Sequence, residues 1–266
     1  MSVLAQLFTA TRARRTCALM PFVAAGDPDL NFTGELVQTL ADAGADMVEI
    51  GVPFSDPMAD GPVIQAAYTR ALARGITLDA VLAAAPAWTA RLPVVLMLYY
   101  NLLFSRGVER AAADCAAAGI AGVIVPDLPP EEAAPVTAAL AKHGLDFIVM
   151  LTPTTPAARA RKLAAQAGGF IYYVALAGVT GARRDLRAEL RAEVTAARAH
   201  GLPVCVGFGI SRPEHVAEVS RFADGVIVGS ALLQQLAAAG DGRAERLRAA
   251  EKFIRALAAA RKEQGS

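Results

Sequence analysis

The chain is poor in the residues that most often bind metals or form covalent intermediates. Its 266 residues include three histidines, three cysteines and four lysines, and no HxH or CxxC spacing occurs. A metal held by three protein nitrogen ligands is therefore not expected. All four lysines lie in predicted helices rather than at strand ends, so a Schiff-base mechanism has no amine to use.

Excess charge and long apolar runs are also missing. The formal net charge is +1, which gives no long-range attraction to nucleic acid or acidic membranes. The longest apolar stretch, 92–104, is interrupted by Pro93 and Asn101 and is too short to span a bilayer. No apolar block with a cleavage site occurs at the N-terminus, and the odd, well-separated cysteines fit buried thiols in a reducing compartment. We expect a soluble, cytoplasmic protein that binds neither nucleic acid nor membranes.

What the chain does have is a regular alternation of short β-branched runs and alanine-rich helical stretches. Hydrophobic residues make up 55% of the chain, enough for a large core. Eight strands are predicted, at 18–24, 47–51, 94–99, 122–126, 147–151, 170–174, 204–207 and 226–228. Helices are predicted between them, among others at 34–43, 108–118, 131–143, 157–167, 186–199 and 213–221.

Eight β-then-α units in a chain of this length predict an α/β fold, the (β/α)8 TIM barrel. A doubly wound open sheet shares the local pattern, but no GxGxxG follows the first strand, and the count of eight favours closure. No linker divides the chain, so residues 1–266 are read as one barrel domain with a short N-terminal helix and a C-terminal helix after 240–242. Glycines 44, 119, 144 and 201 are predicted to end helices as left-handed caps.

The most informative segment is DMVEIGVPFSDPMADGP, residues 46–62, because it buries one acid in an apolar strand. Glu49 is costly to desolvate as a charge, which is typical of a position where a proton is moved. Asp56 and Asp60 follow in the next loop. Other interpretations are a structural ion pair for Glu49, a helix N-cap for Asp60 and a turn-shaping or partner-contacting role for Asp56.

Glycine-rich turns follow the last three predicted strands, at 177–181 (AGVTG), 207–211 (GFGIS) and 228–230 (VGS). Glycine lets backbone N–H groups approach a dianion, and these loops are the usual phosphate position in such barrels. A P-loop motif is absent. We therefore predict carboxylate acid–base chemistry, without metal or cofactor, on a phosphorylated substrate. A tyrosine of the sixth strand, Tyr172 or Tyr173, is a possible participant.

Seven strings in order along the chain carry a resemblance to a known family: PFVAAGDP, VEIGVPFSDPMADGPVIQ, YYNLLF, PDLPPEE, YYVALAGVTG, GFGIS and VGSALL. They resemble the tryptophan synthase alpha chain across nearly the whole sequence. The resemblance implies a lyase of tryptophan biosynthesis that cleaves indole-3-glycerol phosphate to indole and glyceraldehyde 3-phosphate. It also implies a partner, a beta chain that holds pyridoxal phosphate and receives indole in an α2β2 complex, while the alpha chain needs no cofactor.

Matched position by position, the resemblance assigns roles to individual residues. Glu49 would be the general acid–base, Asp60 would stabilise the positive ring through the indole N–H, and Tyr172 would lie near the substrate. Substrate contacts would come from Phe22, Met97, Ile124, Thr180, Gly181, Phe208, Gly209, Gly229 and Ser230, with Thr180 closing onto Asp60. Asp127 and Asn101 would line the site entrance or the partner face. The sequence departs from the family at Ala175 and Ala177, where polar residues are common.

Two alternatives remain open at this stage. One is another phosphate-binding barrel enzyme, such as an indole-glycerol-phosphate synthase or a phosphate-sugar isomerase or epimerase. A synthase is expected to carry a lysine at a strand end, and an epimerase a set of metal ligands. The other is a catalytically silent barrel that acts as an allosteric partner of a beta chain.

Overall fold

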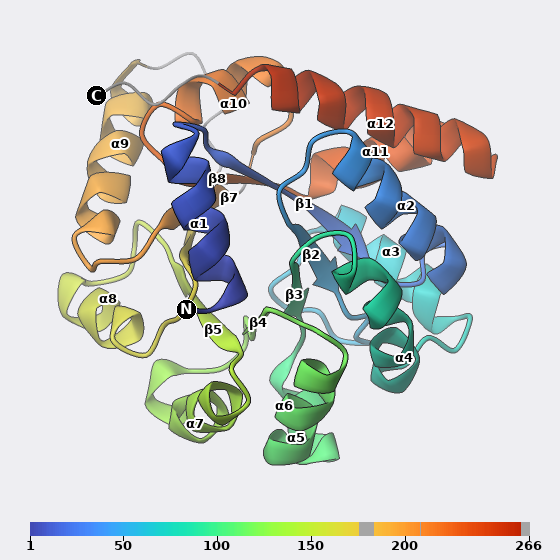
Figure 1. Cartoon of the computed structure of the whole chain (residues 1–266), viewed down its shortest axis with the longest axis horizontal. Helices are drawn as coiled ribbons and strands as arrows, with labels where there is room; N and C mark the ends of the chain where they lie inside the picture. The colour runs from blue at the N-terminus through green and yellow to red at the C-terminus, as the bar shows by residue number, and fades with distance from the viewer. Residues whose placement is uncertain (176–183, 208, 262–266) are drawn as a thin grey trace.

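Eight parallel strands close into a barrel in the computed structural model, which describes residues 1–175, 184–207 and 209–261 (Figure 1). The strands are β1 Ala18–Ala24, β2 Val48–Gly51, β3 Val94–Met97, β4 Gly122–Ile124, β5 Asp146–Leu151, β6 Ile171–Val174, β7 Val204–Gly207 and β8 Gly225–Val228. Each strand pairs with the next along the chain, and β8 pairs with β1 through Ala18 and Gly225. The predicted TIM barrel is confirmed.

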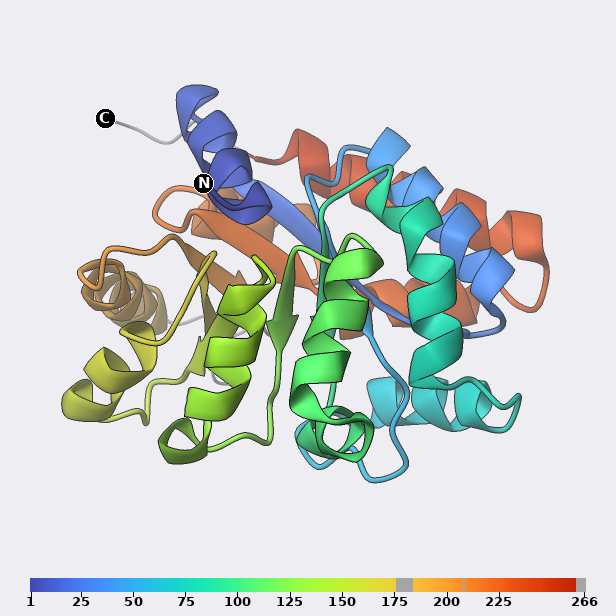
Figure 2. The ribbon, with the colours of Figure 1, turned by 60° about the horizontal axis from the view of Figure 1, so that its bottom comes forward.

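Helices surround the strands as an outer layer (Figure 2). They are α1 Val3–Ala13, α2 Leu30–Asp42, α3 Pro62–Leu72, α4 Leu78–Thr89, α5 Tyr100–Arg106, α6 Val108–Ala117, the 3-10 turn η1 Pro130–Glu132, α7 Ala134–Lys142, α8 Ala157–Ala164, α9 Arg184–Arg198, α10 Pro213–Val219, α11 Ser230–Ala238 and α12 Arg243–Ala259. All four predicted cap glycines have positive φ, between 74° and 100°. No helix of the described residues is long and apolar enough to cross a membrane.

Several predicted boundaries differ from the structure at the ends of strands. The third strand was expected to reach residue 99 but ends at Met97, because α5 begins at Tyr100. The fourth strand ends at Ile124 rather than 126, where Pro126 has no N–H to donate to the ladder. These early endings leave Tyr99 and Asp127 at the barrel mouth, just past the last ladder hydrogen bonds.

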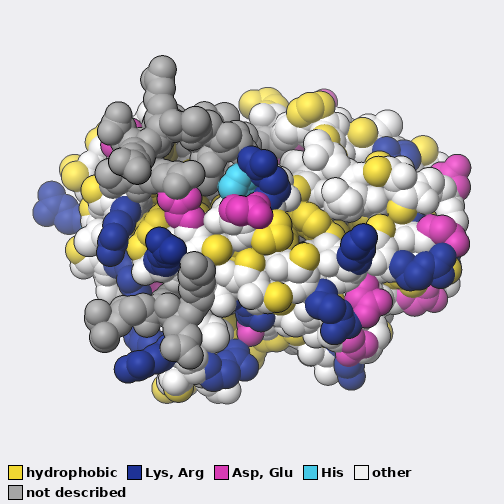
Figure 3. All heavy atoms as spheres, turned by 90° about the horizontal axis from the view of Figure 1, so that it is seen from above, with side chains coloured by type: hydrophobic (Ala, Val, Ile, Leu, Met, Phe, Trp, Pro, Cys, Tyr) yellow, Lys and Arg dark blue, Asp and Glu magenta, His cyan; other side chains and the backbone are white. Residues whose placement is uncertain are grey.

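Both predicted end helices are present. Helix α1 lies at the N-terminal end of the strands, where the ring of Phe8 packs 5.7 Å from that of Phe170. Helix α12 packs on α2 and α11, and Arg243 lies over the ring of Phe32. On the face that carries α12, acidic and basic side chains are interspersed over the described surface (Figure 3). This mixture agrees with the low net charge.

Two carboxylates bind neighbouring strands together at the N-terminal end of the barrel, one on each side of the seam where β1 pairs with β8. Asp46, just before β2, accepts a hydrogen bond from the N–H of Leu19 at 3.0 Å and pairs with Arg14 and Arg261. Asp224, just before β8, accepts one from the N–H of Val204 at 2.9 Å and pairs with Arg198. Both carboxylates are at least 85% buried, with exposed fractions of 13% and 7%. Each joins a strand to its neighbour through side chain as well as backbone.

We predict that Asp46→Ala destabilises the barrel, because it leaves the N–H of Leu19 without this acceptor and Arg261 without its partner carboxylate. The expected cost is about 2–3 kcal/mol, or a fall in Tm of roughly 4–10 °C, measured by calorimetry. The matched control is Asp42→Ala, since Asp42 pairs with Arg91 on the surface and its loss should cost less than about 1 kcal/mol. Equal changes in Tm for the two variants would contradict the role assigned to Asp46.

Candidate active site

Strand register brings the candidate side chains to the inner face of the barrel. Glu49 pairs in register with Phe22 on β1 and Val95 on β3, so their side chains share one face. Two residues further along β2, Gly51 pairs with Met97, which pairs with Ile124. All these side chains are buried, and Phe22, Met97 and Ile124 are at most 7% exposed. They form an apolar wall around one carboxyl group.

Glu49 is buried without a hydrogen-bond partner at its second oxygen. The residue is 1% exposed, and Oε2 has no hydrogen-bond partner among residues 1–175, 184–207 and 209–261. Burial, and then the charge of Asp60, raises the pKa of Glu49 to about 8. Within the described part of the chain, no arginine or lysine forms an ion pair with it, so the structural ion pair considered from sequence is not found. A carboxyl that stays protonated at neutral pH is equipped to give a proton.

Asp60 lies in the loop between β2 and α3 and is held by a tyrosine of the next strand end. The hydroxyl of Tyr99 donates to Asp60 Oδ2 at 2.8 Å and accepts from the N–H of Ala59 at 3.0 Å. The Tyr99 ring stacks on Phe54 with centroids 4.8 Å apart. The N-cap of α3 is Gly61, with no side-chain cap, so the alternative N-cap role of Asp60 is wrong. Its carboxylate points instead to the barrel mouth.

Different environments separate the acidities of the two carboxyl groups. Burial raises the pKa of Asp60 to about 6, although the hydrogen bond from Tyr99 lowers it. At pH 7 Asp60 is therefore mainly ionised while Glu49 is mainly protonated. Two neighbouring carboxyls with separated pKa values are typical of a site in which one is the proton donor and the other stabilises positive charge.

The structure distinguishes the two tyrosines of β6. Tyr172 pairs in register with Cys205, and its hydroxyl fills the space where a Cβ on Gly207 would lie, 2.5 Å away. Burial and then the charges of Glu49 and Asp60 raise the pKa of Tyr172 well above its usual value, so its hydroxyl is neutral. Tyr173 faces the helical shell, where it hydrogen-bonds Glu193 of α9.

The predicted phosphate cradle is described only in part. Gly209 has φ +78°, a left-handed conformation that favours glycine. Gly229 is the N-cap of α11 and Ser230 is its first residue, so free backbone N–H groups lie there. Because β7 and β8 are neighbours, the two turns lie at one side of the mouth. Thr180, Gly181 and Phe208 lie outside the described residues, as does Ala177.

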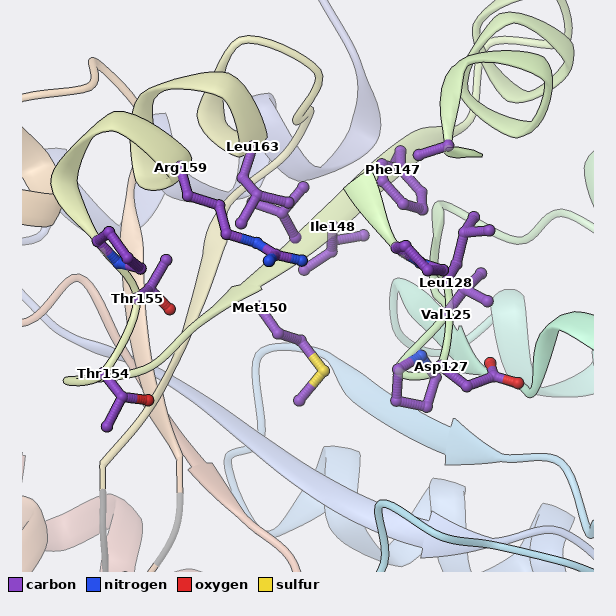
Figure 4. A pocket seen from close by; sticks show the side chains of 15 residues that line it. Val125, Asp127, Leu128, Phe147, Ile148, Met150, Thr154, Thr155, Arg159 and Leu163 are labelled. Carbon is purple, nitrogen blue, oxygen red and sulfur yellow. The ribbon is translucent and has the colours of Figure 1, made fainter. Parts of the chain in front are cut away.

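Other polar residues at strand ends have structural partners. Asp56 is exposed and accepts a hydrogen bond from Ser55 at 2.6 Å. Asp127 accepts one from the N–H of Tyr100 at 2.8 Å and lines a separate cavity of about 450 Å³ between β4, β5 and α8. Figure 4 shows Arg159 reaching across this cavity above Met150. Over the described residues, no group of three His, Cys, Asp or Glu side chains could hold a metal ion.

Two aromatic hydroxyls near the carboxyl groups could not be assigned to the site from the sequence. Tyr99 is the last residue of the third predicted strand, but its hydrogen bond to Asp60 spans 39 residues and has no local signal. Tyr68 of α3 was not singled out at all, although its hydroxyl points to Gly51. A position at a strand end could have indicated Tyr99, whereas nothing in the sequence pattern indicates Tyr68.

The fold is a (β/α)8 barrel, and its mouth holds two carboxyl groups with separated pKa values. The family model for the tryptophan synthase alpha chain matches residues 8–262, and the chain belongs to this family. Its reaction is a carbon–carbon lyase step of tryptophan biosynthesis, the cleavage of indole-3-glycerol phosphate to indole and glyceraldehyde 3-phosphate. The match gives no support to a synthase, isomerase or epimerase.

Relatives and solved structures agree with this assignment. The tryptophan synthase alpha chain of Geobacter sulfurreducens is 52% identical over 237 residues, covering 88% of this chain and 90% of its own. That of Chloroflexus aggregans is 47% identical over 264 residues, 98% of each chain. The crystal structure of the alpha subunit from Legionella pneumophila superimposes with a TM-score of 0.90 at 39% identity, covering 98% of both chains.

Proposed function

We propose that this chain cleaves indole-3-glycerol phosphate with Glu49 as general acid–base and Asp60 as the stabiliser of the positively charged ring. The observation that carries the proposal is the buried, unpartnered Glu49 carboxyl with Asp60 at the same barrel mouth. The indole ring would lie against Phe22, Met97 and Ile124, near the hydroxyl of Tyr172. The phosphate would lie at the turns of Gly209, Gly229 and Ser230, together with Gly181 and Phe208, and Thr180 would close onto Asp60.

The proposed steps balance without a cofactor. Glu49 gives its proton to the ring carbon that bears the side chain, and the ring becomes an indolenine cation paired with Asp60 through its N–H. The Glu49 carboxylate then takes the proton of the adjacent side-chain hydroxyl. The carbon–carbon bond breaks, its electrons restore the aromatic ring, and indole and an aldehyde leave. The ring is the electron sink, so no protein-bound sink is required.

A beta chain is the partner that the family implies, and we propose an α2β2 complex with pyridoxal phosphate only in the beta chain. Two large apolar side chains support docking at the barrel mouth, because Met58 in the β2–α3 loop is 90% exposed and Phe104 on α5 is 66% exposed. Contiguous apolar patches are typical of interaction sites, and Met58 and Phe104 would belong to such a patch. The free, buried cysteines fit a cytoplasmic location, which cell fractionation would test.

Replacement of the two carboxyl groups tests the mechanism. Glu49→Gln should lower kcat by about 10²- to 10⁴-fold, because a positioned proton donor is lost. Asp60→Asn should lower it by roughly 10- to 100-fold through loss of a charged hydrogen-bond partner. Indole release from indole-3-glycerol phosphate is measured with the isolated chain, and Asp56→Asn, in the same loop but exposed, should remain within about twofold of the wild type. Wild-type turnover in Glu49→Gln would exclude Glu49 as the acid, and an inactive wild-type chain would favour a silent barrel.

The pH profile follows from the two pKa values. We expect kcat/KM to fall below pH about 6, where Asp60 becomes protonated, and above pH about 8, where Glu49 loses its proton. Tyr99→Phe removes a hydrogen bond that favours the ionised form of Asp60, so the acid limb should move up by roughly half to one pH unit. The alkaline limb should stay in place, and a profile with no alkaline limb would be incompatible with Glu49 as a proton donor.

Partner docking is tested by co-purification with a tagged beta chain. The double variant Met58→Ser, Phe104→Ser should lose most of the retained alpha chain, because both apolar contacts are removed. Val3→Ser is the control, since Val3 is 52% exposed on α1 at the other end of the barrel. Retention of the double variant at the wild-type level would place the interface elsewhere.

A further inference from the structure

Helix α3 inserts one tyrosine into the upper part of the barrel. Tyr68 is 1% exposed, and its hydroxyl lies 2.2 Å from the point where a Cβ on Gly51 would be. The ring of Phe22 reaches the same space, 2.5 Å from that point. Gly51 follows Glu49 by two residues on the same strand, so the space belongs to the inner face. The absence of a side chain at Gly51 admits both rings.

The Tyr68 hydroxyl is buried and has no hydrogen-bond partner among the residues that the structure describes. A phenylalanine would fill the same volume without the cost of desolvating an unpaired hydroxyl. An unsatisfied buried polar group in a native protein calls for an explanation. The hydroxyl's position, next to the candidate catalytic carboxyls, offers one.

Both carboxyl groups act electrostatically on this hydroxyl. Burial, and then the charges of Asp60 and Glu49, raise the pKa of Tyr68 well above its usual value. The phenol therefore keeps its proton and can act as a hydrogen-bond donor. Oε2 of Glu49 is likewise buried and unpartnered. At the described part of the mouth, an unused donor and an unused acceptor therefore lie on neighbouring elements.

We propose that Tyr68 is a positioning residue whose hydroxyl donates a hydrogen bond to the Glu49 carboxylate once Glu49 has given its proton to the substrate. The inference rests on the proposed function of Glu49. In the resting site Glu49 is protonated and does not need the donor. After proton transfer a negative charge remains in an apolar site. We expect rotation of the Glu49 side chain to bring its carboxylate to the phenol, which keeps its own proton throughout.

Asp60 is the other possible acceptor, and the geometry favours Glu49. Asp60 already receives a hydrogen bond from Tyr99 and is only partly buried, so water can also stabilise its charge. Oε2 of Glu49 receives no hydrogen bond from the described part of the chain. The need for a donor is therefore greater at Glu49. The two possible acceptors also predict different pH profiles, because loss of the donor would move the alkaline limb if Glu49 is the acceptor and the acid limb if Asp60 is.

Tyr68→Phe is the test, read out by kinetics, pH profile and stability together. The kcat should fall by roughly 10- to 100-fold with KM within about threefold, because the hydrogen bond forms only after the proton has moved. The alkaline limb should move up by roughly one to two pH units, because the ionised form of Glu49 loses its donor. Tm should be unchanged or higher, because an unpaired hydroxyl is removed. Tyr173→Phe, on the outer shell, is the control and should alter neither kcat nor the limbs.

Three results would overturn the proposal. One is a kcat within threefold of the wild type with an unmoved alkaline limb. Another is a shift of the acid limb alone, which would make Asp60 the acceptor. The third is a fall in Tm with normal kcat, which would show a structural partner. Titration of carboxyl-labelled Glu49 by NMR needs no turnover. A higher pKa of Glu49 in Tyr68→Phe than in the wild type would therefore support the contact even if the proposed cleavage failed.

Discussion

The structure of this site depends on the desolvation of one carboxyl group. Glu49 is enclosed by Phe22, Val95 and Met97 on the inner face of a parallel barrel, where water cannot stabilise its charge. That environment keeps the proton on the acid near neutral pH, and it makes the ionised state costly until another group compensates for it. The groups around Glu49 can each be related to this free-energy cost of the ionised state. In the proposed mechanism Asp60 balances the positive charge of the ring, the phenol of Tyr99 donates to Asp60, and the phenol of Tyr68 is the donor for the Glu49 carboxylate.

The positions of the site's side chains are fixed by the register between neighbouring strands and not by the conformational preferences of single segments. Phe22, Glu49 and Val95 share a face because β1, β2 and β3 pair in parallel without a bulge, and a shift of one residue would turn the acid to the helical shell. Tyr99 then connects the β2–α3 loop to the end of β3 by two hydrogen bonds. The position of Asp60 is thus set by a neighbouring strand and not by its own loop.

Much of the fold and the central acid could be predicted from the sequence, because both depend on short-range patterns. Strand–helix alternation indicated the barrel, cap glycines indicated the helix ends, and a lone acid in an apolar strand indicated Glu49. Contacts between distant segments could not be predicted in this way. Tyr99 reaches Asp60 across 39 residues, and Tyr68 reaches Gly51 from a different element. Neither has a periodicity or spacing that distinguishes it from a core aromatic.

The Asp46 and Asp224 contacts bear on how this barrel is assembled. Asp46 binds both Arg14 and Arg261, which are separated by almost the entire chain, and the neighbouring seam joins Ala18 to Gly225. During synthesis these contacts become available only after residue 261 has left the ribosome. Until then the nascent strands have two unjoined edges, and such edges can pair with other chains. Ring closure is consequently a late event, and the period before it is when aggregation competes with folding.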